Sequence, residues 1–218
     1  MRATQLAFDV SALTNEDSKT SLPVRVKPTF DEALRKDFAM SAKTSIFRAG
    51  ASAPVKVLLE KNLLSKGSSL NFGKGKYDHD TNSIAEITGH CAGYDYTYMP
   101  DINVLGKSYT NIFSGYVVNT LKKAPRKYVW QQMASCSVDG VVFVAARTDT
   151  KNINGTDFED GKITSIGTFQ RSYAEKGSLV KEAKDYFEHV VEIKGKSGFV
   201  LIAASHVKLP ENVLANAK

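Results

Sequence analysis

The chain has 218 residues, 42% hydrophobic and 24% charged, which suits one globular domain and excludes wholesale disorder. No stretch approaches the roughly 20 apolar residues that cross a bilayer, and the first residues lack the apolar run of a signal peptide, so we expect a cytoplasmic location and no membrane partner. The net charge of +6 leaves nucleic acid open as a partner, because a basic surface attracts phosphates; a lysine-rich surface without such a partner is the alternative.

The chain contains two cysteines, Cys91 and Cys136. This number fits a reduced compartment and is too small for a metal cluster together with His79 or His90. We therefore predict no metal site, and we interpret both cysteines as packing residues.

Residues 1–42 show little regular pattern. Leu6, Phe8 and Val10 alternate as in a short strand, and the two prolines of Pro23–Pro28 favour an extended segment. We interpret residues 1–42 as an N-terminal extension packed on a main domain that spans residues 43–218.

Strands and helices alternate from Lys43 onward. A helix is expected to begin at Pro54, where the missing N–H costs nothing, and to end at Gly67. The patterns that follow predict, in chain order, a strand at 68–73, a helix at 81–88 closed by Gly89, strands at 90–96 and 109–115, a helix from Pro125, a strand at 141–146, a helix over Leu179, Ala183 and Phe187, and strands at 189–193 and 199–204.

This order of elements predicts an α/β fold with a doubly wound, mostly parallel sheet. The continuous apolar run Val141–Ala146 is typical of a strand that helices cover on both faces. Lys194–Gly198 is long enough only for a hairpin, so one C-terminal strand should be antiparallel. Pro100–Lys107 is too short for a strand and a helix, which indicates that one repeat is abbreviated.

Two strand ends carry residues suited to a nucleoside. In open α/β sheets, ligands bind beyond the carboxyl ends of the strands, where the strand order reverses. Gly73 and Gly75 follow the first strand and would let the backbone approach a ligand closely. Asp95 follows the next strand, where a carboxylate can accept both hydroxyl hydrogen bonds of a ribose. Each feature alone fits an ordinary turn, but their order and spacing favour a nucleoside site.

A third strand end, Phe113–Asn119, follows the strand predicted at 109–115. Tyr116 could flank a bound ligand, and Asn119 could donate a hydrogen bond to it. Packing and capping at a helix start is the alternative interpretation of both residues.

Four stretches between residues 43 and 205 resemble class I S-adenosylmethionine-dependent methyltransferases of phages and of bacterial DNA phosphorothioation gene clusters. Methyltransferases of this fold end in a β-hairpin, whereas Rossmann dehydrogenases usually do not. The four stretches are Thr44–Arg48 with Ser52–Pro54, Asn71–Lys76, Tyr116–Thr120, and Gly167–Gln170 with Tyr173.

The resemblance implies S-adenosylmethionine as the cofactor, in a Rossmann-like methyltransferase domain. The residues that it implies in donor binding are Asn71, Gly73 and Gly75 of the glycine loop, Asp95 for the ribose, Ser114 and Tyr116, and Arg48 for the methionine carboxylate. Three positions depart from the family pattern: Asn71 replaces the usual acid, Tyr77 replaces a third glycine, and Lys74 brings a cation close to the sulfonium.

The leading hypothesis is methyl transfer to an unidentified acceptor, in the host cytoplasm if the chain is phage-encoded. Ser114–Val117 lacks the prolines of the DNA amino-methyltransferase turn, and no Pro-Cys pair supplies a cytosine-ring nucleophile, so no catalytic residue is singled out. An alternative is a noncatalytic protein of this fold that acts as a nucleic-acid-binding or virion-associated partner, as the basic run Lys122–Lys127 suggests. A dinucleotide oxidoreductase is disfavoured because Tyr77 breaks the G-x-G-x-x-G spacing.

Overall fold

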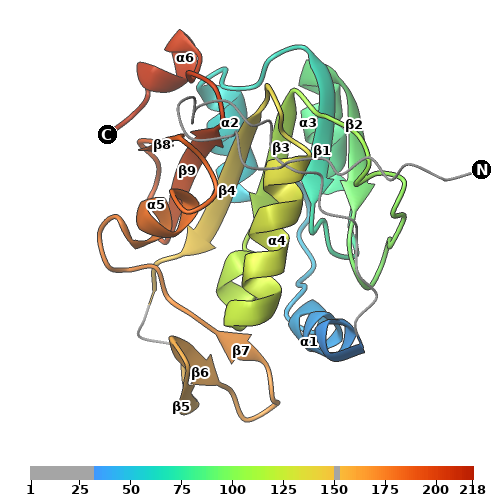
Figure 1. Ribbon diagram of the computed structural model, residues 1–218, viewed down its shortest axis with the longest axis vertical. Helices are drawn as coiled ribbons and strands as arrows, with labels where there is room; N and C mark the ends of the chain where they lie inside the picture. The colour runs from blue at the N-terminus through green and yellow to red at the C-terminus, as the bar shows by residue number, and fades with distance from the viewer. Residues whose placement is uncertain (1–31, 150–152) are drawn as a thin grey trace, which may run out of the picture.

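A six-stranded sheet with the order β2-β1-β3-β4-β9-β8 forms the centre of the molecule (Figure 1). The computed structural model describes residues 32–149 and 153–218. β1 to β4 are parallel, and β9 runs antiparallel to both β4 and β8. The predicted doubly wound, mostly parallel sheet with an antiparallel hairpin strand is therefore confirmed. The strands are β1 (Gly67–Phe72), β2 (Gly89–Tyr94), β3 (Asn111–Gly115), β4 (Val141–Arg147), β8 (His189–Glu192) and β9 (Phe199–Ser205).

Helices cover both faces of the sheet, as Figure 1 shows. Alternate residues of β4 supply the two cores: Val142 and Val144 pack on one side, Val141 and Phe143 on the other, because side chains of a strand alternate between faces. The first core includes side chains of α1 (Glu32–Ala42), α4 (Lys123–Ser135) and α5 (Ser178–Ala183), and the second includes side chains of α2 (Ala53–Glu60), α3 (His79–Thr88) and α6 (Glu211–Leu214).

The strand order reverses at β1. The chain passes from β1 through α3 to β2 on one side, and then returns to place β3 on the other side of β1. The switch point therefore lies at the carboxyl ends of β1 and β3, where α/β folds bind ligands.

The connection between β2 and β3 contains no helix and no further strand of the sheet; both elements and the connection lie within the described residues. Asp95 and Met99 form an isolated bridge, and the Tyr109 hydroxyl donates to the Val104 carbonyl at 2.8 Å. The abbreviation expected at Pro100–Lys107 is confirmed, and it leaves this side of the switch point bordered by a loop.

The expected end of the first predicted helix is wrong. α2 ends at Glu60, and Gly67 opens β1 instead. Asn62 adopts a left-handed φ of 51°, and the Leu63 N–H bonds to the Leu58 carbonyl at 3.0 Å, which is the geometry of a Schellman cap. Asparagine is the residue other than glycine that tolerates this conformation, and the buried Leu63 completes the cap with an apolar contact.

The last predicted helix is shorter than its spacing indicated. α5 ends at Ala183, although Phe187 continues the same apolar stripe. Phe187 lies beyond the helix end and still packs in the core beside Leu179. The spacing therefore identified buried residues correctly and the helix length incorrectly.

A second, antiparallel sheet lies beyond the carboxyl edge of the main sheet, at the lower end of Figure 1. Its strands are β5 (Thr156–Phe158), β6 (Gly161–Ile163) and β7 (Phe169–Gln170). α1 lies at the same edge of the main sheet. The sequence patterns did not predict this second sheet.

Within the described residues, no helix is long and apolar enough to cross a membrane, and no group of three or more His, Cys, Asp and Glu side chains is placed to hold a metal ion. The strand expected at Leu6–Val10 and the extended segment Pro23–Pro28 lie outside those residues. The domain boundary after residue 42 stays a prediction.

Candidate ligand site at the carboxyl edge of the sheet

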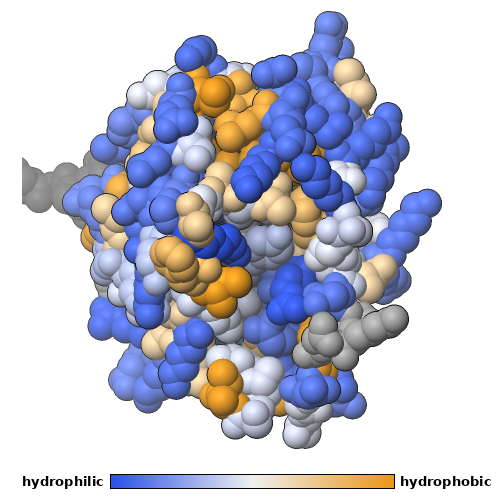
Figure 2. Space-filling view, turned by 180° about the vertical axis from the view of Figure 1, so that it is seen from behind, coloured by the Kyte–Doolittle hydropathy of each residue, from blue (hydrophilic) through white to orange (hydrophobic). Residues whose placement is uncertain are grey.

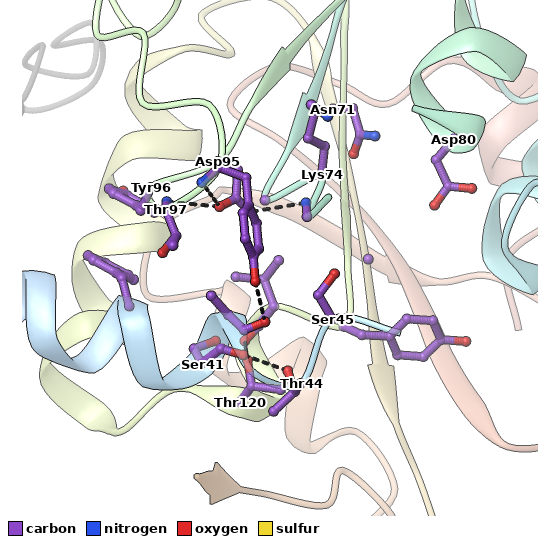
Figure 3. A pocket seen from close by; sticks show the side chains of 18 of the residues that line it. Ser41, Thr44, Ser45, Asn71, Lys74, Asp80, Asp95, Tyr96, Thr97 and Thr120 are labelled. Atoms are coloured by element: carbon purple, nitrogen blue, oxygen red, sulfur yellow. Dashed lines mark hydrogen bonds between the residues drawn. The ribbon is translucent and has the colours of Figure 1, made fainter. Parts of the chain in front are cut away.

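A cavity with a volume of about 110 Å³ opens at the carboxyl ends of β1, β2 and β3. Figure 3 shows the cavity between four segments: the loop after β1 with Lys74, the loop after β2 with Asp95, the segment after α1 with Ser45, and the start of α3 with Asp80 (Figure 3). A cavity therefore lies at the switch point of the sheet.

Six of the seven residues that sequence reasoning assigned to the donor line this cavity. They are Arg48, Asn71, Gly73, Gly75, Asp95 and Tyr116. Ser114 is the exception, because its side chain is fully buried inside the sheet and its hydroxyl has no hydrogen-bond partner among the described residues. The structure therefore places Ser114 behind the cavity wall, out of reach of a ligand.

The glycine loop has the backbone that only glycine adopts readily. Gly73 and Gly75 have φ values of 74° and 68°. A Cβ on Gly73 would lie 2.3 Å from a methyl carbon of Val117, and a Cβ on Gly75 would lie 2.6 Å from the Ser45 Oγ. A side chain at either position would therefore clash with Val117 or Ser45, whereas the bare backbone of both glycines lines the cavity.

Asp95 ties the two loops at the cavity together. Its Oδ2 accepts the Gly75 N–H at 2.9 Å, and its Oδ1 accepts the N–H groups of Thr97 and Tyr98 at 2.9 and 3.0 Å. A carboxylate oxygen accepts about two hydrogen bonds, so one position remains free, at Oδ2. In this structure the carboxylate can accept one ribose hydroxyl, rather than the two that the sequence suggested.

Tyr116, after β3, and Arg48, between α1 and α2, also line the cavity. Tyr116 follows β3 directly and has a φ of 63°, a rare conformation for a bulky residue and one that recurs at functional sites. The Arg48 guanidinium lies 5.5 Å from the centroid of the Tyr116 ring and makes no salt bridge within the described ranges. Its planar fork is available to a carboxylate or phosphate.

Burial raises the pKa of the Tyr116 phenol, and the nearby Arg48 charge opposes this effect only in part. The phenol therefore stays protonated at neutral pH. In that form it can donate a hydrogen bond or wall the cavity, and it does not serve as a base.

Asp80 is a cavity residue that sequence reasoning missed. It lies in the first turn of α3, and its Oδ1 accepts the Ser52 N–H at 2.6 Å while the side chain lines the cavity. An acid in the first turn of a helix is common because it complements the helix dipole. The sequence therefore contained no signal that separated Asp80 from an ordinary helix start.

The two residues that could have blocked the loop do not fill the cavity. The Lys74 Nζ pairs with Asp78 at 2.7 Å, and the Lys74 stem covers Gly93. Tyr77 is not among the residues that line the cavity. The Lys74 cation, which is unfavourable beside a sulfonium, is therefore paired with Asp78, the residue that precedes α3.

The basic run Lys122–Lys127 has partners inside the protein. Lys122 pairs with Asp37 at 2.8 Å, and the buried Arg126 contacts Asp160 and Glu182. These pairings neutralise two of the four cations of the run, and Lys123 and Lys127 remain exposed. A nucleic-acid partner for this run stays a prediction.

Comparison with known proteins identifies the fold. No family model and no curated protein matches the chain. DhpI in its complex with SAH is 14% identical, with a TM-score of 0.50 over 78% of this chain and 92% of that chain. An O-methyltransferase family protein from Burkholderia thailandensis is 10% identical, with a TM-score of 0.49 over 71% of this chain and 55% of that chain.

A second complex of DhpI, with SAM and HEP, is 12% identical, with a TM-score of 0.48 over 78% of this chain and 93% of that chain. At such identities a likeness concerns the fold. The DhpI–SAH complex and the strand order together define a Rossmann-like methyltransferase fold for this chain.

Proposed function

We propose that the cavity binds S-adenosylmethionine and that the protein transfers its methyl group to an acceptor at the cavity mouth. One observation carries this proposal: a single cavity at the switch point collects the glycine loop, Asp95, Arg48 and Tyr116. The resemblance of four sequence segments to methyltransferases and the fold shared with the DhpI–SAH complex support it. The resemblance alone supports a relation to the phage and phosphorothioation-associated enzymes.

The polar groups of the cavity suit the two ends of this donor. Arg48 would hold the methionine carboxylate through its guanidinium fork, and the free position on the Asp95 Oδ2 would accept one ribose hydroxyl. Asp80 places a negative charge in the same cavity, where it would attract the α-ammonium group. The neutral Asn71 therefore does not leave the cavity without an acid.

The bound donor supplies a methyl group that is already electrophilic, because it is attached to a positively charged sulfur. The residues of this chain need only align the two reactants and exclude water, and such alignment can contribute roughly 7–11 kcal/mol. The protonated Tyr116 would shape the passage between donor and acceptor. A base is required only for an acceptor that must lose a proton before attack.

Isothermal titration calorimetry with S-adenosylhomocysteine tests the proposal. Asp95→Ala removes the free acceptor position and loosens the glycine loop, so we expect the affinity to fall at least about tenfold, as the loss of a charged hydrogen bond predicts. Asp101→Ala is the matched control, because Asp101 also caps a turn, through the Asn103 N–H at 3.0 Å, but does not line the cavity.

Saturable binding that only Asp95→Ala weakens supports donor binding. The proposal is contradicted if S-adenosylhomocysteine gives no saturable heat, if both variants have equal effects, or if NAD binds instead.

A noncatalytic protein of the same fold is the second candidate, and the hydrogen bonds of Asp95 favour it. Three acceptor positions of this carboxylate are used by backbone N–H groups of the protein itself. Calorimetry distinguishes the candidates: if the protein binds no S-adenosylhomocysteine, the noncatalytic candidate is favoured.

A further inference from the structure

Four aromatic rings lie near the mouth of the cavity, and three of them are unusually exposed. The side chains of Phe47, Tyr77 and Tyr98 are 67%, 38% and 38% exposed. The edge of Phe47 meets Tyr77 at 5.2 Å between ring centroids and meets His79 at 6.3 Å. We call Phe47, Tyr77, His79 and Tyr98 the aromatic strip. Figure 2 shows the rear face of the molecule, where hydrophilic side chains predominate and apolar side chains gather in a few small patches (Figure 2).

Basic side chains are interleaved with the aromatic strip. The Lys76 Nζ lies 5.3 Å from the centroid of the Tyr98 ring, and the Lys76 N–H donates to the Ser45 Oγ at 3.5 Å. The Tyr98 hydroxyl donates to the Ala42 carbonyl, next to the exposed Lys43. Residues 43–50 and 73–80, which contain Phe47, Tyr77 and His79, hold four Lys and Arg against two acids, so these two segments carry a net charge of +2.

The aromatic strip is continuous with the cavity. A smaller hollow beside Tyr77 and His79 shares five lining residues with the main cavity: Ser45, Ile46, Arg48, Lys74 and Asp80. A group that lies on the strip is therefore next to the opening of the proposed donor site. This continuity separates the strip from apolar side chains that are exposed elsewhere on the surface.

We propose that the aromatic strip binds single-stranded nucleic acid, with bases stacked on Phe47 and Tyr77 and phosphates held by Lys43 and Lys76. Exposed aromatic rings beside cations are the combination by which proteins bind unpaired strands, because each base offers a face for stacking and each phosphate offers a charge. A duplex hides those faces. An apolar protein partner would gain nothing from the interleaved lysines, so the charge favours a polyanion.

Strand binding by itself does not depend on the proposed donor site. The further step, that the bound strand is the methyl acceptor, rests on the proposed function. The two parts can therefore fail separately, and they are measured separately.

Fluorescence anisotropy with a labelled single strand of about 12 nucleotides, and with the matching duplex, tests strand binding. We expect the single strand to bind at least about tenfold more tightly than the duplex. Phe47→Ala and Tyr77→Ala should each weaken binding roughly 5- to 100-fold, as the loss of one stacked base predicts. Lys76→Ala should reduce the slope of log affinity against log salt by about 0.7.

Phe158→Ala is the matched control. Phe158 is 44% exposed on β5, and the Lys122 Nζ lies 5.7 Å from its ring centroid, so it repeats the ring-and-lysine pair away from the cavity. The affinity of the Phe158→Ala variant for the single strand should equal that of the natural protein. Circular dichroism melting verifies that every variant is folded.

The proposal is overturned if the single strand does not bind at low salt, if the duplex binds equally well, or if Phe158→Ala weakens binding as much as Phe47→Ala. Calorimetry with S-adenosylhomocysteine on Phe47→Ala separates the two proposals. Strand binding that depends on Phe47, in a protein that binds no S-adenosylhomocysteine, supports the strip and contradicts the donor site.

Discussion

Asp95 shows how one side chain joins several parts of the site. Its three backbone hydrogen bonds connect the glycine loop to the turn after β2. The sequence placed Asp95 at the end of its strand, and the structure adds that most of its acceptor capacity serves the protein itself. If Asp95 binds the donor as proposed, ligand binding and loop geometry are coupled at this residue.

The positions of Gly73, Gly75 and Asp95 at neighbouring strand ends were sufficient to predict that they line one cavity, because these strand ends lie close together at the switch point. That Val117 lies close to Gly73, and Ser45 close to Gly75, could not be predicted in the same way. These contacts join segments that are distant in the chain, and hydrophobic periodicity carries no information about which side chain fills a given space.

Cys91 offers a prediction at the level of one thiol. Burial raises the pKa of Cys91 to about 12, and Cys136 is fully buried. Since the thiolate is the reactive form, only about one Cys91 in 10,000 is reactive at pH 8. We expect neither cysteine to react with iodoacetamide within minutes at that pH, as measured by mass spectrometry.

The same reaction in concentrated urea is the control, and both thiols should then be modified rapidly. Because the folded-state pKa is raised, the Cys91 reaction should accelerate as the pH rises toward 12. Rapid modification of Cys91 in the folded protein at pH 8 would show that its environment is more open than the structure indicates.

Among the elements, a buried ionic cluster joins α4, α5 and the segment after β7. Glu182 on α5 accepts hydrogen bonds from the Trp130 Nε1 at 2.7 Å and the Tyr173 hydroxyl at 3.1 Å. It also pairs with Arg126 and Arg171, and both arginines contact Asp160 between β5 and β6. This cluster connects the small sheet to the main domain.

Glu182→Gln should destabilise the protein by about 3 kcal/mol, because breaking a buried ion pair leaves its partners uncompensated. Urea unfolding followed by circular dichroism measures the change. Glu188→Gln is the control, since the Glu188 side chain is 77% exposed and its change should be close to zero. A loss below about 1 kcal/mol in Glu182→Gln would contradict a stabilising role for the cluster.

Buried strands were easier to predict from the sequence than exposed ones. β4 and β9 were located from their apolar runs, since strands buried on both faces have few polar residues. The small sheet was missed because β5 and β6 have no buried residue and no apolar alternation. The end of α2 was missed because Asn62 caps it in the place where glycine is usual.

For the whole molecule, the topology was the most predictable feature. The short connection Lys194–Gly198 permitted only a hairpin, and this placed β9 antiparallel between β4 and β8. The abbreviated connection after β2 was predictable from its length alone. The position of α1 at the cavity edge depends on tertiary contacts, such as the hydrogen bond between the hydroxyls of Ser41 and Thr120 at 2.6 Å.

A crystal structure of the protein grown with S-adenosylhomocysteine tests donor binding most directly. We expect the ligand in the cavity at the switch point, with its carboxylate at Arg48 and a ribose hydroxyl on the Asp95 Oδ2. Crystals grown at saturating ligand that show no ligand in the cavity, or a ligand bound away from Arg48 and Asp95, would contradict donor binding at this site.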